Sequence, residues 1–175
     1  KVRIKLLSYD DKGNLTETVS NTLKNNIINY LSEFRMINDF IDIVSGQVID
    51  FSLEIDLILD KNVNSTDVIR NTITKTISYF SIDKRKMGDP LFLGNLFKEI
   101  GDENGVINVV DIRVFVKTGG EYSLSEVSQQ YKDPIRKEVL QSDMTIFMKS
   151  NQIFQIRFPN KDIKVRVKTL GSTTF

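Results

Sequence analysis

Residues 48–59 read VIDFSLEIDLIL, and apolar and polar side chains alternate over the length of a long strand. The apolar side comprises Ile49, Phe51, Leu53, Ile55, Leu57 and Leu59. The other side is mostly acidic, with Ile58 as its exception, and carries Asp50, Ser52, Glu54, Asp56 and Asp60. Because successive side chains of a strand point to opposite faces, the stretch predicts a strand with one face in the core.

Before this strand, the chain predicts a strand, a helix and a second, short strand. Val2, Ile4 and Leu6 alternate with basic residues, as in a half-buried strand. Apolar residues at steps of three and four over residues 19–34 predict an amphipathic helix with Thr16 as its N-cap. Residues 40–44 form a short apolar run, and the Ser-Gly pair at 45–46 predicts a hairpin into the long strand.

After the long strand, two helices and a last strand complete the order. Asn64 is a good N-cap, and Asp67 three residues later suits a capping box. A short helix follows over residues 93–100, and residues 110–116 alternate as a strand. The order β-α-β-β-α-β predicts an α+β domain over residues 1–117 with a ferredoxin-like core.

The ferredoxin-like layout makes one pairing prediction that a structure can test. It places Val2–Leu6 beside Ile49–Leu59 in parallel. The outward basic residues Lys1, Arg3 and Lys5 would then lie next to the acidic face of the long strand. Opposite charges on neighbouring strands contribute about 0.2–1 kcal/mol per pair.

The rest of the chain predicts an arm and a small β-rich subdomain. Residues 118–134 contain Gly119-Gly120 and several Ser and Gln, as in a linker or extended arm. Residues 135–175 hold a possible helical turn at 135–140 and three short strand patterns, at 144–149, 152–158 and 163–168. We expect these patterns to form an appended meander. Its apolar set comprises Ile146, Met148, Phe154, Ile156, Phe158, Ile163, Val165 and Val167.

A meander of this size has too little core to be stable alone. It either folds back on its own sheet or reaches a neighbouring subunit. Free strand edges and the preceding arm favour the second outcome. The sequence therefore predicts that residues 135–175 are a main subunit contact, in a dimer or a ring.

Composition excludes several kinds of chemistry. The 175 residues contain neither His nor Cys, which removes the commonest general base and all thiolate ligands. The net charge of +1 is not typical of a protein that binds polyanions. No apolar run is long enough to cross a membrane. The sequence starts at Lys1 and not at Met, so we expect it to be a fragment of a longer chain.

The acidic face of the long strand is the best candidate for metal or acid–base chemistry. Asp50, Glu54, Asp56 and Asp60 could bind Mg²⁺ or act as paired carboxylates, and Asp42 or Asp111 could join them in the fold. The ordinary interpretation is a solvated strand face, in which every second residue is polar. We favour that interpretation, and predict no metal site, no cofactor site and no catalytic residue.

A basic strand near the C-terminus is the candidate for phosphate contacts. It carries Lys164, Arg166 and Lys168, with Arg157 on the strand before. Aromatic residues that stack on bases are not interleaved with these cations, which favours a solvated or ion-paired strand face. Lys84-Arg85-Lys86 has another explanation, because cations stabilise the C-terminal end of a helix. Gly119-Gly120 lacks the context of a phosphate-binding loop and is interpreted as a flexible joint.

One stretch of the chain resembles a known family. The long strand over 48–59 is followed by a helix with Asp67-Val68-Ile69 that runs into Tyr79-Phe80. The motifs Met87-Gly88-Asp89-Pro90-Leu91 and Gly105-Val106-Ile107 come next, the second leading into the last strand. In this order, residues from about Phe40 to Lys117 resemble the C-terminal part of the baseplate J-like family of contractile-tail phages and related injection systems. Asn104 stands where the family often has Pro before Gly-Val.

The resemblance implies a structural role. Within the family, the chain looks most like the wedge subunits of T4-type baseplates, which form the inner ring by self-association, bind other wedge proteins and have no catalytic role. It thus implies a virion protein of the tail baseplate, assembled in the host cytoplasm, without a small-molecule substrate, specific nucleic acid or membrane as partner. Two alternatives stay open: a nucleic-acid-binding ferredoxin-like module, and a carboxylate-based, metal-dependent enzyme.

Overall fold

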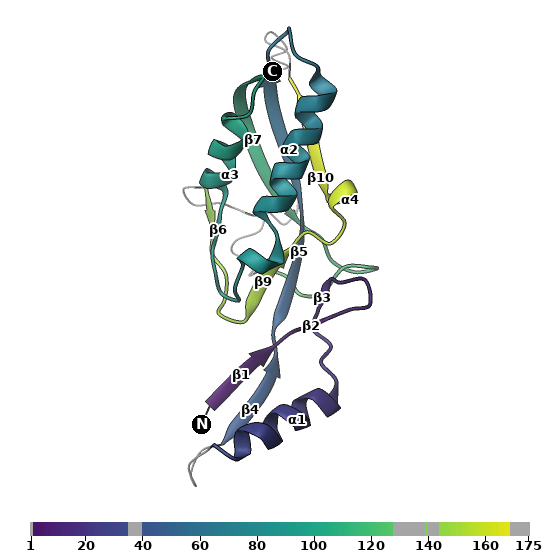
Figure 1. The fold of residues 1–175 in the computed structure, drawn as a ribbon, viewed down its shortest axis with the longest axis vertical. Helices are drawn as coiled ribbons and strands as arrows, with labels where there is room; N and C mark the ends of the chain where they lie inside the picture. The colour runs from purple at the N-terminus through teal and green to yellow at the C-terminus, as the bar shows by residue number, and fades with distance from the viewer. Residues whose placement is uncertain (1, 35–39, 128–138, 140–143, 169–175) are drawn as a thin grey trace.

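The computed structural model describes residues 2–34, 40–127, 139 and 144–168. Helices alternate with strands of several sheets, so the predicted α+β class is confirmed. The molecule is elongated, and the 13-residue strand β5 (Gln47–Leu59) runs along its middle (Figure 1). Among the described helices, none has the length and apolar character needed to cross a bilayer.

The larger part of the molecule is a sheet covered by helices. In it, β5 lies between β7 (Val106–Val116), which is antiparallel to it, and β10 (Ile163–Val167), which is parallel. The first residues of β5 also pair in parallel with β9 (Gln152–Gln155). The helices α2 (Ser65–Tyr79) and α3 (Leu93–Gly101) lie on one face of the sheet (Figure 1). We call this part the body.

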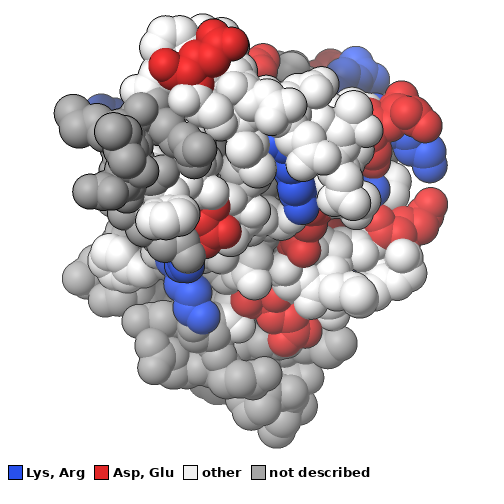
Figure 2. Space-filling view, turned by 90° about the horizontal axis from the view of Figure 1, so that it is seen from below, with Lys and Arg blue, Asp and Glu red and all other residues white. Residues whose placement is uncertain are grey.

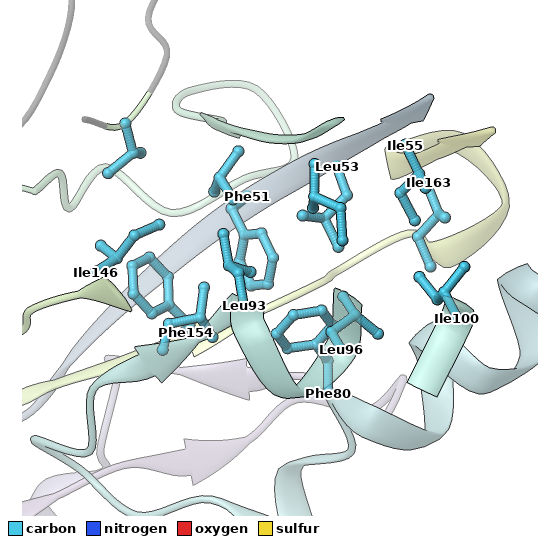
Figure 3. Packing of buried hydrophobic residues seen from close by; sticks show 14 of the residues in the cluster. Phe51, Leu53, Ile55, Phe80, Leu93, Leu96, Ile100, Ile146, Phe154 and Ile163 are labelled. Carbon is cyan, nitrogen blue, oxygen red and sulfur yellow. The ribbon is translucent and has the colours of Figure 1, made fainter. Parts of the chain in front are cut away.

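The core of the body forms where the apolar side of β5 meets the helices. Phe51 is fully buried, and its ring makes edge-on contacts with the rings of Phe80 and Phe154, each at 5.2 Å between centroids. Leu93 and Leu96 of α3 pack into the same cluster (Figure 3). The predicted alternation of β5 is therefore confirmed on its apolar side, from Ile49 to Leu59.

The start of α2 matches its sequence signal. The Asn64 side chain accepts a hydrogen bond from the Thr66 backbone N–H at 3.1 Å and donates one to Asp67 at 2.8 Å. Further along, the buried positions include Thr72 and Thr76. Each threonine hydroxyl donates to the carbonyl four residues earlier, which removes the cost of burying it.

Several short strands and turns lie between the longer elements. The two-residue strand β6 (Leu91–Phe92) pairs with β8 (Thr145–Ile146), and β2 (Ser8–Tyr9) pairs with β3 (Leu15–Thr16). A 3₁₀ turn at Ile82–Lys84 follows α2. The single-turn helix α4 (Pro159–Asp162) separates β9 from β10.

A smaller unit projects from the lower end of the body (Figure 1). It consists of β1 (Val2–Leu6), α1 (Asn21–Ser32) with the two residues after it, and β4 (Ile41–Ser45) with Phe40 before it. The strands β1 and β4 form a separate two-stranded parallel sheet, and α1 packs against β4. We call residues 2–6, 21–34 and 40–45 the projecting unit. The helix begins later than predicted, because Ser20 and not Thr16 caps it.

Gly46 joins the projecting unit to the body. A Cβ atom at this position would lie 2.8 Å from Met87 Sδ and 2.9 Å from Leu7 Cγ, so only glycine fits without displacement. The chain continues from β4, which pairs with β1, into β5, which pairs with β7 and β9 of the body. The predicted hairpin at Ser45-Gly46 is therefore wrong, because glycine here permits close packing and not a reversal.

The predicted parallel pairing of Val2–Leu6 with Ile49–Leu59 is also wrong. β1 pairs with β4, with Val2 opposite Ile41 and Arg3 opposite Asp42. The position beside β5 is taken by β10, which has the same alternation of basic and apolar residues. The ferredoxin-like order of strands is accordingly not confirmed.

The C-terminal strands do not form the predicted meander. β9 and β10 both pair with β5, and β8 pairs with β6, so none of them pairs with another of the three. Ile146, Phe154 and Ile163 are buried in the same core as the β5 side chains. Described residues on both sides of the proposed boundaries at 117 and 135 thus share one core. Of the predicted turn at 135–140, only Val139 lies within the described residues.

Candidate interaction surface

The two charged stripes of the sequence meet on the face of the sheet that α2 and α3 leave open. The parallel register places Lys164 opposite Glu54 and Arg166 opposite Asp56. The Asp56 carboxylate forms ion pairs with Arg166 Nε at 3.1 Å, Lys168 Nζ at 2.9 Å and Arg113 Nη2 at 3.2 Å. Arg166 also pairs with Glu54. This arrangement matches the ion-paired interpretation of the basic strand. The favoured interpretation of the acidic face as solvated is wrong at Asp50 and Asp56, because both side chains are buried and have polar partners.

The ion pairs hold Asp56 in its charged form. Burial of Asp56 acts to raise its pKa, but the hydrogen bond from Lys168 and the charges of the neighbouring cations together lower the pKa below its ordinary value. A carboxyl whose pKa is lower in the folded state stabilises the fold above its unfolded pKa of about 4. That stabilisation is lost as the pH falls through the folded-state pKa.

We expect Asp56→Asn to lower the free energy of unfolding by about 2 kcal/mol at neutral pH, because three cations lose their charged partner. The cations are partly exposed, so solvent screening keeps the effect below that of a fully buried pair. Urea unfolding at pH 7 and near pH 3 measures the effect, which should shrink at the lower pH. Asp11→Asn in the exposed β2–β3 turn is the matched control and should change little. An equal loss for Asp56→Asn at both pH values would contradict the assignment.

Asp50 belongs to a different, buried network. Its carboxylate is fully buried and accepts hydrogen bonds from the Ser123 backbone N–H at 2.6 Å and from Gln155 Nε2 at 3.1 Å. Burial raises the pKa of Asp50. Gln155 Oε1 in turn accepts from the Leu15 backbone N–H at 2.6 Å. The network ties the segment before α1, the predicted arm and β9 to β5, which is a structural role.

Of the remaining acidic candidates, only Asp111 is shown beside Asp56: it lies opposite Asp56 on β7, and both carboxylates pair with Arg113. Asp60 accepts a hydrogen bond from the Asn62 backbone N–H in the turn after β5. Asp42 pairs with Arg3 in the projecting unit, and Asp111 pairs with Arg113. In the part of the chain that the structure describes, no three acidic side chains are grouped as a metal site.

The other basic candidates are also engaged. Lys84 Nζ and Arg85 Nη2 donate to the carbonyls of Ser78 and Tyr79 at the C-terminal end of α2, as a helix-capping role requires. These residues line a cleft of about 480 Å³. Arg157 pairs with Asp10 at 2.9 Å.

The projecting unit differs from the body because it has no buried side chain of its own. Every described residue of β1, α1 and β4 is exposed or half-buried. Large apolar side chains are instead open to solvent. They are Val2 at 49%, Leu23 at 43%, Tyr30 at 65%, Phe34 at 71% and Phe40 at 69% exposed.

These side chains lie on two surfaces of the unit. Leu23 and Tyr30 lie on α1, and Phe34 lies two residues after its end. The rings of Tyr30 and Phe34 are 5.4 Å apart between centroids. Val2 and Phe40 are joined by a hydrogen bond at the start of the two strands. Figure 2, which views this end of the molecule, shows wide uncharged areas between separate charged side chains. We define Val2, Leu23, Tyr30, Phe34 and Phe40 as the apolar surface.

Neither the protein-family models nor the curated proteins contain a match to this chain. The apolar surface therefore has to be interpreted from its physical properties alone.

The apolar pattern over residues 19–34 could have indicated this surface if the amount of sheet beside the helix had been known. The pattern over residues 19–34 predicts an amphipathic helix, and such a helix normally buries its apolar stripe. Within the described residues, the sheet against which α1 packs consists of the five-residue strands β1 and β4, so the unit has too little sheet to cover the whole apolar side. The predicted contact residues in β8, β9 and β10, by contrast, include Ile146, Phe154 and Ile163, which are buried in the body.

Proposed function

We propose that this chain is a structural assembly module that binds other protein subunits, and that it serves in the baseplate of a contractile tail. The observation that carries the proposal is the apolar surface of the projecting unit. Exposed large apolar side chains gathered on one small unit, with the rings of Tyr30 and Phe34 in contact, are typical of interaction sites. Aromatic residues are moreover enriched at the centres of protein interfaces.

The architecture of the projecting unit supports the same proposal. Parallel sheets are normally covered on both faces, and a two-stranded sheet alone is marginally stable in water. In the described residues, β1 and β4 each pair with one strand, and α1 packs against β4. A partner that covers the unit would supply the missing burial.

This proposal moves the contact element from residues 135–175 to the projecting unit. In the described C-terminal strands, Ile146, Phe154 and Ile163 are buried in the core of the body. Val2, Leu23, Tyr30, Phe34 and Phe40 are exposed together in the small projecting unit, while the other exposed apolar side chains, such as Phe92, Leu124 and Phe147, belong to the larger remainder of the described chain. Self-association and contacts with other wedge proteins remain the proposed partners.

The baseplate assignment rests on the resemblance of residues 40–117 to the baseplate J-like family. We propose a virion location and no catalytic role on that basis. The ion pairs of Arg166 and Lys168 with Asp56 give no support to a nucleic-acid-binding module, because these cations already have partners. The engagement of Glu54, Asp56 and Asp111 by Arg113, and of Asp50 by Ser123 and Gln155, gives none to a carboxylate enzyme.

Mass spectrometry of contractile-tail particles tests this function. The particles are purified from the system that encodes the chain and washed at high salt. We expect peptides of this chain at a fixed ratio to the other tail proteins. Intact, functional particles without these peptides would contradict the baseplate assignment.

A further inference from the structure

The apolar stripe of α1 has the spacing of a helix that packs against another helix. Leu23, Ile27 and Tyr30 of α1, and Phe34 two residues after its end, are separated by four, three and four residues, which corresponds to successive d and a positions of a heptad repeat. The half-buried residues Lys24, Ile28 and Leu31 lie roughly a quarter of a turn away around the helix. The exposed residues Leu23, Tyr30 and Phe34 are therefore presented to one side of the face that α1 turns to the strands, and the half-buried Ile27 lies between the two.

We propose that this stripe packs against the same stripe of a second copy of the chain, with the two α1 helices antiparallel about a twofold axis. The proposal deepens the proposed function, because it names one partner of the projecting unit. An antiparallel pair centred between Ile28 and Asn29 brings Leu23 opposite Phe34 of the second copy and Ile27 opposite Tyr30.

Size complementarity favours a second copy as the occupant. Each contact of the antiparallel pair joins a large aromatic side chain with a smaller aliphatic one, as interdigitating layers require. A parallel pair would instead place Phe34 on Phe34 and Leu23 on Leu23. The stripe itself carries no charge, so two copies approach without like-charge repulsion at its centre.

The area of the stripe sets the strength of the contact. From their exposed fractions, Leu23, Tyr30 and Phe34 present roughly 350 Å² of surface per copy, given the size of aromatic side chains. Two copies thus bury roughly 700 Å², below the 1,200–2,000 Å² or so of stable complexes. The dimer of the isolated chain is therefore weak, with a dissociation constant in the micromolar range or above.

Sedimentation velocity of the full chain over a wide concentration range tests the proposal. We expect a reversible monomer–dimer equilibrium. Tyr30→Gln/Phe34→Gln keeps good helix formers and should weaken the dimer by at least about 30-fold. Phe147→Gln on the body, a similarly exposed aromatic, is the matched control and should leave the equilibrium unchanged. Circular dichroism verifies that each variant is folded.

A mixing experiment tests the antiparallel arrangement. Leu23→Lys and Phe34→Glu should each weaken the homodimer. Mixed in equal amounts, the two variants should form a dimer again, because one contact pairs Lys with Glu and the other keeps Leu against Phe. A parallel pair offers no such match, so failure of the mixture to associate more strongly than either variant would overturn the antiparallel arrangement.

The two proposals fail in different ways. A wild-type chain that stays monomeric at millimolar concentration, or a dimer that Tyr30→Gln/Phe34→Gln leaves intact, overturns the α1 pair. Either result leaves the chain's presence in tail particles untouched. Absence from the particles, with a dimer of the isolated chain intact, overturns the baseplate function alone.

Discussion

A chain that ends at Lys117 is expected to lose its cooperative fold. It lacks β9 and β10, both of which pair with β5, and it loses the buried side chains of Ile146, Phe154 and Ile163. Burial of a large apolar side chain contributes about 1.5–3 kcal/mol. Three such side chains and the lost strand pairs together approach the whole stability of a typical domain, about 5–15 kcal/mol.

Thermal unfolding followed by circular dichroism measures this effect. A chain cut after Lys168 keeps every described element and is the control, with an expected sigmoidal transition. The chain cut after Lys117 should show a broad, non-cooperative change. A sharp transition in that chain would show that residues 118–168 are a separable appendage, and would contradict the single core of the body.

Phe51→Ala is expected to be the most damaging single truncation of the body. The ring lies between Phe80 after α2 and Phe154 of β9, so its removal opens a cavity where three segments meet. Replacement of a buried Phe by Ala costs about 3–5 kcal/mol. Urea unfolding measures the loss, and Phe147→Ala, an exposed position, should cost less than about 0.5 kcal/mol. A loss below about 1 kcal/mol for Phe51→Ala would contradict this packing.

Local patterns in the sequence were sufficient to predict individual elements. The alternation from Ile49 to Leu59 gave the long strand with its buried side, and Asn64 with Asp67 gave the start of α2. These predictions succeed because strand alternation and helix capping depend on residues close in sequence.

The choice of strand partners could not be made in this way. Charge matching correctly indicated that a basic strand lies beside the acidic face of β5, but two strands fit that description. Val2–Leu6 and Ile163–Val167 share the same alternation, and only the second occupies the place. Nothing local distinguishes them, because strand partners are fixed by long-range packing.

The candidate surface was missed for a related reason. The stripe of Leu23, Tyr30 and Phe34 has the same period whether a helix is buried in its own domain or covered by a partner. Whether the stripe is buried within the domain depends on how much sheet lies beside α1. The hairpin wrongly predicted at Gly46 placed β4 next to β5 and so made that sheet too large. Once β4 is separated from β5, the projecting unit is seen to be too small to bury its own apolar residues.

The central claim is that the projecting unit, and not the C-terminal segment, carries the subunit contact. Hydroxyl-radical footprinting of the chain, free and within purified tail particles, tests it most directly. We predict that Tyr30, Phe34 and Phe40 react readily in the free chain and become protected in the particle, while Leu124, 83% exposed on the body, reacts more nearly alike in both. Equal reactivity of Tyr30 and Phe34 in both states, with protection confined to residues 144–168, would contradict the claim.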